Sequence, residues 1–330
     1  MKRRDFICGL SCMLAGFGLC EAKTKMIPQK KCNNPSKDMY IPINKELSEI
    51  YIETTFHCNL NCKSCDAFSP ISKQEMVKYD EFLRDFSKIK ELYPNKDIDI
   101  LYLGGEPLLN PDLLKMVKKT RELFPNGKQS IMTNGILLAD MDEEFWNSMK
   151  NNNVKLRVTC HPVDIDRKKS ELLAEKYGIE LESDVIYSDK LYDINTHKVT
   201  KNNLENSEQQ KKCKHHWSKP IMDISGSQDY IEKFYTCVHR CFGNSYFNGN
   251  LYLCWRHTHL RVFSDYFNLN IPITKNDYIK IADVKDAKEI NDFISSPNKL
   301  CSYCKQCHNT CFNGKPKEWG FSEKDISEWT

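Results

Sequence analysis

Neither sign of charge dominates this sequence. Lysine and arginine number 48, and aspartate and glutamate number 45, so the formal net charge of the 330 residues is +3. A nearly balanced chain lacks the broad basic surface that nucleic acids require, and we expect a small-molecule or peptide partner and no nucleic acid. With 40% hydrophobic and 28% charged residues, disordered and fibrous classes are excluded, and one large domain with a smaller one is expected.

A run of apolar residues long enough to cross a bilayer is also lacking near the N-terminus. The uncharged stretch from Phe6 to Cys20 has fifteen residues, whereas a membrane-spanning helix needs about 20. Arg3 and Arg4 before this stretch resemble a twin-arginine export signal, although the following residues form a poor cleavage site. The alternative is a start codon near Met26 or Met39. We therefore treat residues 1–40 as a presequence-like or disordered segment.

Cysteine is the residue in excess. The chain has 16, about 5% of its length, which is too many for an ordinary cytosolic enzyme unless disulfides or metals explain them. Their clustering favours metals, and two separate metal sites are the first inference. The main groups are Cys58, Cys62 and Cys65, then Cys237, Cys241 and Cys254, then Cys301, Cys304, Cys307 and Cys311.

From Ser48 onward, apolar strand patterns alternate with amphipathic helix patterns. Strands are predicted at 48–55, 97–103, 128–133 and 155–160, and the helix after the first is indicated by Phe82, Phe86 and Ile89 at helical spacing. Repeated βα units predict a parallel sheet or barrel. This rhythm breaks after Val185.

A cysteine-rich α+β extension is predicted to follow the barrel. Residues 245–254 form an expected hairpin in which Asn248 and Gly249 supply the positive φ angles of a two-residue turn. The polar composition beyond it predicts a small domain that a metal group stabilises. The expected boundaries are 41–212 for the barrel and 213–330 for the extension.

The first cysteine group has the spacing C-x3-C-x2-C directly after the first predicted strand. Cys58, Cys62 and Cys65 are suited to three irons of one [4Fe-4S] cluster and leave the fourth iron open for a small molecule. A structural zinc site closes all four positions and usually takes two CxxC pairs. The spacing therefore favours iron and sulfur here.

This motif resembles that of the radical S-adenosylmethionine (radical SAM) superfamily, whose fold is a partial (β/α)6 barrel. The resemblance implies that the open iron binds S-adenosylmethionine and that the three cysteines are catalytic. It also implies that reductive cleavage of S-adenosylmethionine yields a 5′-deoxyadenosyl radical that abstracts hydrogen from substrate. The family commonly has an aromatic residue before the last cysteine to contact adenine. Here that residue is Ser64, so we expect adenine packing from another residue such as Phe68.

Further motif residues follow the other predicted strands. Gly104, Gly105, Glu106 and Pro107 match the GGEP of the family, in which the glycines allow close backbone approach and the carboxylate is suited to the methionine ammonium group. Thr133 and Asn134 end the third strand and are expected beside the ribose and sulfonium, with a simple Asn-Gly turn as the alternative. Cys160 and His161 end the fourth, where buried packing is the expectation and a substrate-cavity role the alternative. Parallel barrels build active sites at these strand ends.

The C-terminal cysteines resemble the SPASM and twitch extensions of radical SAM enzymes, which hold auxiliary clusters. The spacing departs from the longer SPASM pattern, so one auxiliary [4Fe-4S] cluster is expected rather than two, with zinc as the alternative metal. The expected ligands are Cys254, Cys301 and Cys304 with Cys237 or Cys241, and Cys307 and Cys311 either replace one of these or are unused. Arg256, two positions after Cys254, is a candidate for binding an anionic substrate group, with an exposed loop as the alternative.

The resemblance implies an oxidoreductase that acts on a peptide or a cell-envelope carbohydrate, with a reducing partner such as flavodoxin or ferredoxin. A metal-stabilised scaffold with the same fold is the alternative function. We expect a cytoplasmic protein, because S-adenosylmethionine and low-potential electron donors are cytosolic, and export through residues 1–22 is the alternative.

Overall fold

The predicted strands form the centre of one open sheet. The computed structural model describes residues 46–185, 191–192, 195–196, 199–200, 221–236, 243–295, 302–308 and 319–330. Its α-helices are α1 (Tyr79–Leu92), α2 (Leu113–Leu123), α3 (Glu143–Asn151), α4 (Arg167–Tyr177), α6 (Tyr230–Thr236), α7 (Trp255–Tyr266), α8 (Ala287–Ser295) and α9 (Ser302–Gln306). Short 3-10 helices include η2 (Ser69–Ile71), η3 (Pro107–Leu109) and η7 (Ile326–Glu328).

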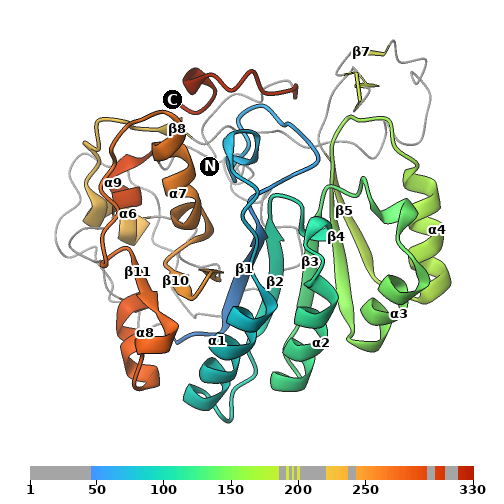
Figure 1. Cartoon of the computed structure of the whole chain (residues 1–330), viewed down its shortest axis with the longest axis horizontal. Helices are drawn as coiled ribbons and strands as arrows, with labels where there is room; N and C mark the ends of the chain where they lie inside the picture. Colours follow the sequence, from blue (N-terminus) through green and yellow to red (C-terminus); the bar gives the residue numbers. More distant parts are fainter. Residues whose placement is uncertain are drawn as a thin grey trace, which may run out of the picture.

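Five parallel strands follow one another in space in the order of the sequence. They are β1 (Glu49–Thr55), β2 (Asp99–Gly104), β3 (Gln129–Thr133), β4 (Val154–Cys160) and β5 (Leu181–Val185). Helices α1–α4 connect them and lie along one side of the sheet (Figure 1). The chain is thus an α/β protein whose sheet stays open, which confirms the predicted partial-barrel class.

The predicted apolar faces attach these helices to the sheet. Phe82, Phe86 and Ile89 of α1 are each 0% exposed, and α3 buries Phe145 and Trp146 in the same way. Helix α4 differs, because its buried residues are the small Ser170 and Ala174, while Leu173 and Tyr177 are only partly buried. Apolar residues three or four positions apart therefore identify the buried faces of α1 and α3.

The predicted hairpin forms and joins the main sheet. Strands β9 (Asn244–Phe247) and β10 (Asn250–Tyr252) flank a turn with φ of 43° at Asn248 and 82° at Gly249. Strand β9 runs parallel to β1 and pairs Ser245 with Tyr51, while β11 (Tyr278–Lys280) extends the edge beyond β10. The sheet order is β11-β10-β9-β1-β2-β3-β4-β5. Residues from the C-terminal third therefore lie directly beside the first strand.

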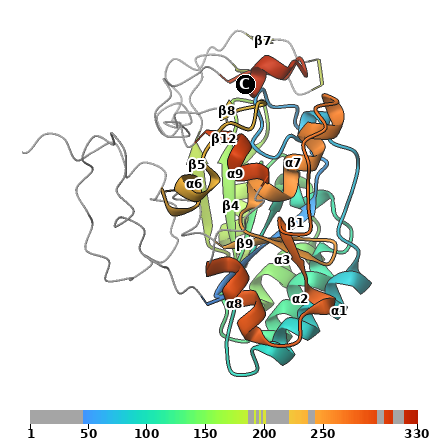
Figure 2. The same cartoon turned by 90° about the vertical axis from the view of Figure 1, so that its left-hand side faces the viewer.

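Helix α7 covers the face of β1 and β9 that is opposite α1. Tyr246 of β9 packs on Phe86 of α1 with ring centroids 5.2 Å apart. Its neighbour Ser245 instead accepts a 2.6 Å hydrogen bond from Thr258 of α7. Because successive strand residues point to opposite faces, the two helices must lie on opposite sides. Figure 2 shows α6, α7 and α9 in the upper half of the molecule and α8 with α1–α3 in the lower half.

Two pairs of two-residue strands lie outside the main sheet. Strands β6 (Leu191–Tyr192) and β7 (Val199–Thr200) pair with each other, and β8 (Ile221–Met222) pairs with β12 (Cys307–His308). No helix within the described ranges combines the length and the apolar character that spanning a bilayer takes. The predicted segment 1–40 lies outside the described residues.

Candidate functional site

The loop after β1 carries the three cysteines of the first motif. This cysteine loop, residues 56–68, leaves β1 after Thr55 and ends at η2. Cys62 is buried, and Cys58 and Cys65 are half-buried. All three cysteines pack in one apolar cluster, which we call the thiol cluster and which includes Leu60 and Trp319. The three thiols therefore lie in one cluster beyond the C-terminal end of β1, the place that the motif predicts.

Burial in the thiol cluster raises the pKa values of the thiols. The pKa of Cys58 is raised to about 12, first by burial and then by the charges of Glu106 and Cys65. Burial also raises the pKa of Cys62, with Cys65 and Cys58 adding to the effect, while a hydrogen bond from the Trp319 indole lowers it. Thiols that raise one another's pKa ionise together only when a bound cationic group offsets the repulsion.

The donor set fits an iron–sulfur cluster. A cluster binds each thiolate at a different iron, and Cys58, Cys62 and Cys65 offer three free thiols from one loop. The Leu60 amide donates to Cys58 Sγ at 3.3 Å, and such N–H···S contacts stabilise cluster thiolates. The thiol cluster therefore matches the chemistry of a [4Fe-4S] group, because it offers sulfur donors in apolar surroundings and an amide directed at one of them.

The two glycines of GGEP bring the end of β2 against the cysteine loop. The amide of Gly105 donates to Thr55 O at 2.7 Å, and the amide of Glu106 donates to His57 O at 2.9 Å. A Cβ atom on Gly105 would lie 2.0 Å from His57 O, and one on Gly104, where φ is 123°, would lie 2.3 Å from Thr55 O. The close approach that the motif predicts is therefore to protein backbone, because the loop itself occupies the space beside both glycines.

The carboxylate of Glu106 joins the ends of β2 and β3. It is 0% exposed, and its Oε1 accepts from Thr133 Oγ1 at 2.7 Å and from the Leu108 amide at 3.1 Å. Its Oε2 accepts from the Asn134 amide at 2.8 Å. Burial raises the pKa of Glu106 to about 7, although these three donors act in the opposite direction. Pro107, also buried, begins η3 directly after the carboxylate.

Asn134 connects the end of β3 to the cysteine loop. Its side-chain amide donates to Asn59 Oδ1 at 2.8 Å and lies 3.5 Å from Cys58 Sγ. Its Oδ1 accepts from the Ile136 amide at 2.9 Å. Thr133 and Asn134 thus meet Glu106 and Cys58 at one edge of the sheet. The Asn-Gly turn and the link to the site are both present, since Gly135 follows with φ of 77°.

His161, which follows β4, lies beside the thiol cluster. His161 Nδ1 lies 3.9 Å from Cys62 Sγ, and its ring centroid is 5.9 Å from that of Trp319. Burial, and then the positive charge of Arg167, lower the pKa of His161 to about 3, so the ring is neutral at physiological pH. Cys160, one residue earlier, packs in the main core. Of this pair, only the histidine lies beside the cysteines.

Neither position considered for adenine packing has exposed surface. Phe68 is 0% exposed, and its ring packs 5.1 Å from Phe263 and 5.8 Å from Trp329. The Ser64 side chain is 2% exposed and its φ is 52°. The structure therefore places Phe68 in the core instead of beside a cofactor, and an aromatic residue at position 64 would have no open surface to reach.

Arg256 has an internal partner in place of the expected anionic ligand. It lies in the first turn of α7, is 3% exposed, and donates from Nη2 to Asp66 Oδ2 at 2.9 Å. Asp66 directly follows Cys65, so this ion pair attaches α7 to the cysteine loop. On the same helix, His259 lies 2.8 Å from the buried carboxylate of Glu53. These residues form a buried helix face, and this corrects the prediction of an exposed or substrate-facing segment.

The described part of the auxiliary cysteine set is divided between two places. Cys254 is the residue before α7, and Cys304 lies in α9, a helix that contacts α7. Cys307 begins β12, pairs with Met222 and is 7% exposed in the main core. The remaining candidates, Cys237, Cys241, Cys301 and Cys311, lie outside the described residues. The auxiliary site therefore stays a prediction.

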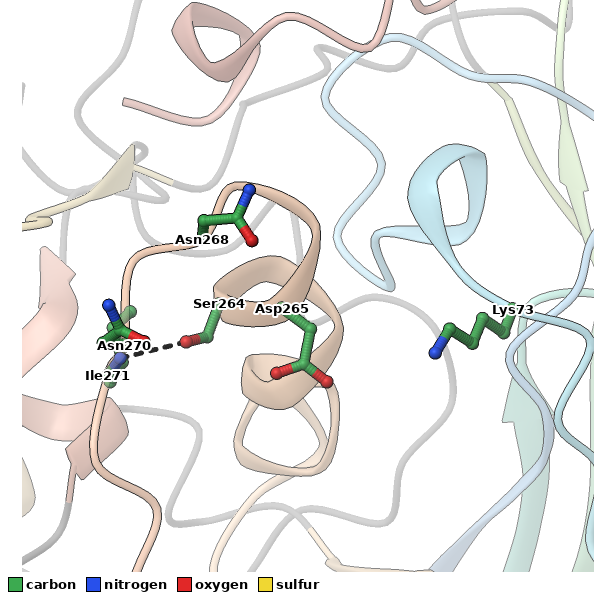
Figure 3. A pocket seen from close by; sticks show the side chains of 6 residues that line it. All are labelled: Lys73, Ser264, Asp265, Asn268, Asn270 and Ile271. Atoms are coloured by element: carbon green, nitrogen blue, oxygen red, sulfur yellow. Dashed lines mark hydrogen bonds between the residues drawn. The ribbon is translucent and has the colours of Figure 1, made fainter.

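A separate hollow lies beyond the C-terminal end of α7. It has a volume of about 520 Å³ and is lined by Lys73, Ser264, Asp265, Asn268, Asn270 and Ile271. Figure 3 shows Lys73 reaching toward the end of α7 that carries Asp265. Ser264 Oγ accepts from the Ile271 amide at 3.0 Å, so this hydroxyl secures the following turn. No predicted site residue lines this hollow.

Several residues that contact the cysteine loop could not be identified from the sequence around them. Trp319, Glu328 and Trp329 contact the cysteine loop from more than 250 positions away. Asn59 is the one that the motif itself contains, as the residue after Cys58. Contacts between distant segments depend on the tertiary fold, and a single sequence gives no spacing rule for them.

The site lies within a segment that matches a known family. A family model described as the radical SAM superfamily matches residues 52–177. The GTP 3',8-cyclase of Clostridium botulinum strain Okra is 29% identical over 129 residues, and that of Campylobacter jejuni subsp. doylei is 28% identical over 134 residues. The alignments cover 38% and 40% of this chain and 39% and 40% of those enzymes. The chain thus matches about two fifths of the length of these relatives.

Two solved structures are similar to this chain over most of its length, at lower sequence identity. BtrN in complex with AdoMet and 2-DOIA has a TM-score of 0.47 and 16% identity, covering 81% of this chain and 94% of BtrN. Native anSMEcpe with bound AdoMet has a TM-score of 0.45 and 15% identity, covering 84% of this chain and 93% of that protein. The family match, from β1 to the end of α4, contains the cysteine loop, Glu106 and Asn134. Residues 52–177 of this chain thus form a radical SAM domain.

Proposed function

We propose that this protein is a radical SAM enzyme that holds a catalytic [4Fe-4S] cluster on Cys58, Cys62 and Cys65. The observation that carries the proposal is the convergence at one edge of the sheet. Cys58, one of the three thiols in the loop after β1, lies beside the Asn134 side chain from the end of β3, and the Asn134 backbone amide donates to Glu106 from the end of β2. Three sulfur ligands leave one iron open. When bound, the cluster supplies an electron that cleaves S-adenosylmethionine to a 5′-deoxyadenosyl radical, which takes hydrogen from substrate.

The protein groups around the thiols are suited to seat the cofactor. Glu106 Oε2 accepts one hydrogen bond, from the Asn134 amide, and an ionised carboxylate oxygen has a second lone pair for an ammonium group. We infer that the methionine end of S-adenosylmethionine binds here. Because the Glu106 side chain is 0% exposed in this structure, the ammonium group reaches Oε2 only when the surrounding residues move apart. Thr133 and Asn134 hold Glu106 and Cys58 in position, and Gly104 and Gly105 let the backbone supporting them approach the loop. Phe68 has no part in this proposal.

We also propose one auxiliary [4Fe-4S] cluster, with zinc as the alternative. Cys254 and Cys304 support it, because Cys254 directly precedes α7 and Cys304 lies in α9, a helix that contacts α7. Cys301, with Cys237 or Cys241, would complete the set, and the core position of Cys307 makes it the least suited of the group. Metal analysis of a variant that lacks the three catalytic cysteines tests this site. About four remaining irons per chain support the auxiliary cluster, whereas zinc without iron overturns it.

The substrate and the reducing partner are proposed here only by their chemical class. A peptide or a cell-envelope carbohydrate is the proposed substrate, and a small low-potential protein such as flavodoxin or ferredoxin is the proposed reductant. Both S-adenosylmethionine and such donors are cytosolic, which is why we place the enzyme in the cytoplasm. A metal-stabilised scaffold with the same fold is the alternative, and Ser64 before Cys65 is the departure from the motif that favours it.

The deciding experiment is turnover of S-adenosylmethionine without substrate. The protein is reconstituted anaerobically with iron and sulfide, reduced with dithionite and given S-adenosylmethionine, and 5′-deoxyadenosine is measured. The matched control is the variant with Cys58, Cys62 and Cys65 all changed to alanine. We expect 5′-deoxyadenosine from the wild type only. Equal amounts from both proteins would overturn the proposed function.

A further inference from the structure

The last residues of the chain lie across the cysteine loop. We call residues 319–330 the C-terminal strap. Phe321 forms an antiparallel bridge with Cys62, the Lys63 amide donates to Gly320 O at 2.8 Å, and the Ser322 amide donates to Asn61 O at 2.8 Å. In Figure 1 this segment, in red, lies at the same end of the sheet as the blue loop after β1. The strap thus pairs with the loop as a short strand would.

Glu328 fixes a left-handed position of the loop. Its Oε2 accepts from the Ser64 amide at 3.1 Å and from Ser322 Oγ at 2.8 Å, and its Oε1 accepts from the Glu323 amide at 2.7 Å. The φ of 52° at Ser64 is left-handed, a conformation that costs a non-glycine residue about 1 to 2 kcal/mol. The carboxylate therefore stabilises a backbone conformation that the loop would leave if it were unsupported.

Trp329 fixes the next residue. Its indole Nε1 donates to Cys65 O at 2.9 Å, and its side chain is 0% exposed. The ring packs 5.8 Å from that of Phe68 and 6.0 Å from that of Phe267 of the α7 C-terminus. One donor and one fully buried ring thus hold the carbonyl of a cysteine that the motif uses. Trp319, at the other end of the strap, packs against Cys62.

We propose that the C-terminal strap is a positioning element of the cluster site, in which Glu328 and Trp329 hold residues 62–65 in the conformation that presents the thiols together. Neither side chain touches the reacting atoms. The proposal rests on the proposed function to the extent that a cluster binds these thiols. It adds residues far outside the matched family segment to the machinery of the site.

The physical reason is the entropy of an irregular loop. Between β1 and η2 the cysteine loop has no regular secondary structure, and ordering a residue costs about 1 to 2 kcal/mol. Contacts that order the loop before metal binding remove that cost from cluster insertion. Groups that orient metal ligands typically change metal affinity by about 10- to 100-fold, and effects of this size are expected for the strap.

The first test compares two conservative tryptophan variants in the reconstituted full-length protein. Trp329→Phe removes the donor to Cys65 O and keeps an aromatic ring. Trp146→Phe is the matched control, since the buried Trp146 indole of α3 donates to Met141 O at 3.2 Å, away from the loop. We expect iron release to a chelator to be about 10-fold faster in Trp329→Phe and unchanged in the control. Equal release from Trp329→Phe and the wild type would overturn the proposal.

The second test needs no cluster and so separates the two proposals. Amide hydrogen exchange is measured on the full-length protein before reconstitution, for peptides covering residues 58–68. Trp329→Phe and Glu328→Gln are each expected to speed exchange there by about 10-fold, with exchange in β2 and β4 unchanged. Wild-type protein that takes up no iron would overturn the proposed function. Unchanged loop exchange in both folded variants would overturn the strap.

Discussion

The hydroxyl of Thr133 donates a 2.7 Å hydrogen bond to the buried Oε1 of Glu106. This contact joins the C-terminal ends of β3 and β2, and the Asn134 amide, which donates to Oε2, completes the link. Because Asn134 also reaches Asn59 and Cys58, the ends of three adjacent strands form one hydrogen-bonded unit. The carboxylate that the motif assigns to cofactor binding therefore also holds the site together.

Glu106 is expected to make the stability of the cluster-free protein depend on pH. Its pKa is about 7 when folded, above the usual carboxyl value, so the folded state binds the proton more tightly. Its contribution is complete below about pH 4.5 and is lost as pH rises to about 7, amounting to about 3 kcal/mol. Urea unfolding between pH 5 and 8 should show a fall in wild type that Glu106→Gln lacks. The low pKa of His161 acts in both proteins and cancels in the comparison. Identical profiles would contradict the buried state of Glu106.

Gly105 is expected to tolerate no side chain. In Gly105→Ala the Cβ would lie 2.0 Å from the His57 carbonyl, so the cysteine loop must move or the strand must shift. We expect a loss of about 3 kcal/mol or more in the free energy of unfolding. Gly178→Ala is the control, because φ there is 68° but no atom lies within 4 Å, and it should cost about 1 kcal/mol. Chemical denaturation measures both, and similar losses would mean that the contact at Gly105 is not limiting.

Two arginines of α7 provide a test of burial. Arg256 pairs with Asp66 at 2.9 Å and its side chain is 4% exposed, whereas Arg261 pairs with Glu75 at 2.7 Å and is 51% exposed. Breaking a buried pair by removing one partner costs about 3 to 5 kcal/mol, less where the other partner keeps contact with water, as Asp66 does at 36% exposure. We expect Arg256→Ala to destabilise by about 2 kcal/mol and Arg261→Ala by less than about 1 kcal/mol. Thermal unfolding of the two variants in parallel decides, and a larger effect at Arg261 would contradict the assignment.

Asn134 is expected to tune the reduction potential of the cluster. Its side-chain amide lies 3.5 Å from Cys58 Sγ, and hydrogen bonds to thiolate sulfur stabilise the more negative, reduced state. Asn134→Ala should therefore lower the midpoint potential in an anaerobic redox titration. Asn152→Ala, which removes an amide that bonds Ser148 O at the end of α3, serves as the control. A potential that stays at the wild-type value in Asn134→Ala would mean that this amide does not reach the cluster.

The elements that depend on local spacing were predictable from the sequence. Phe82, Phe86 and Ile89 recur at helical intervals and occupy the buried face of α1, and Asn248 with Gly249 forms the expected hairpin turn. The site motifs also follow this rule, because each lies at the end of a predicted strand and parallel strands end at one edge. Cys58, Glu106 and Asn134 are therefore placed together by topology.

Features that depend on contacts between distant segments were not predictable. Nothing near Ser245 indicates that β9 pairs with β1, and nothing near Trp329 indicates that it binds the carbonyl of Cys65. The interpretations of Phe68 and Arg256 rested on their neighbours in sequence, whereas their surroundings come from α7, the strap and Asp66. Buried aromatic and charged residues near a motif are thus ambiguous until the elements packed over them are known.

The central claim is that Cys58, Cys62 and Cys65 hold a [4Fe-4S] cluster with one iron open to S-adenosylmethionine. Electron paramagnetic resonance of the reduced, reconstituted protein tests it directly, in a variant that lacks the auxiliary candidates Cys254 and Cys304 so that one cluster is observed. We predict a reduced-cluster signal that changes when S-adenosylmethionine is added and that is absent when Cys58 is replaced by alanine. A signal that S-adenosylmethionine leaves unchanged, or a protein that binds only zinc, would contradict the account.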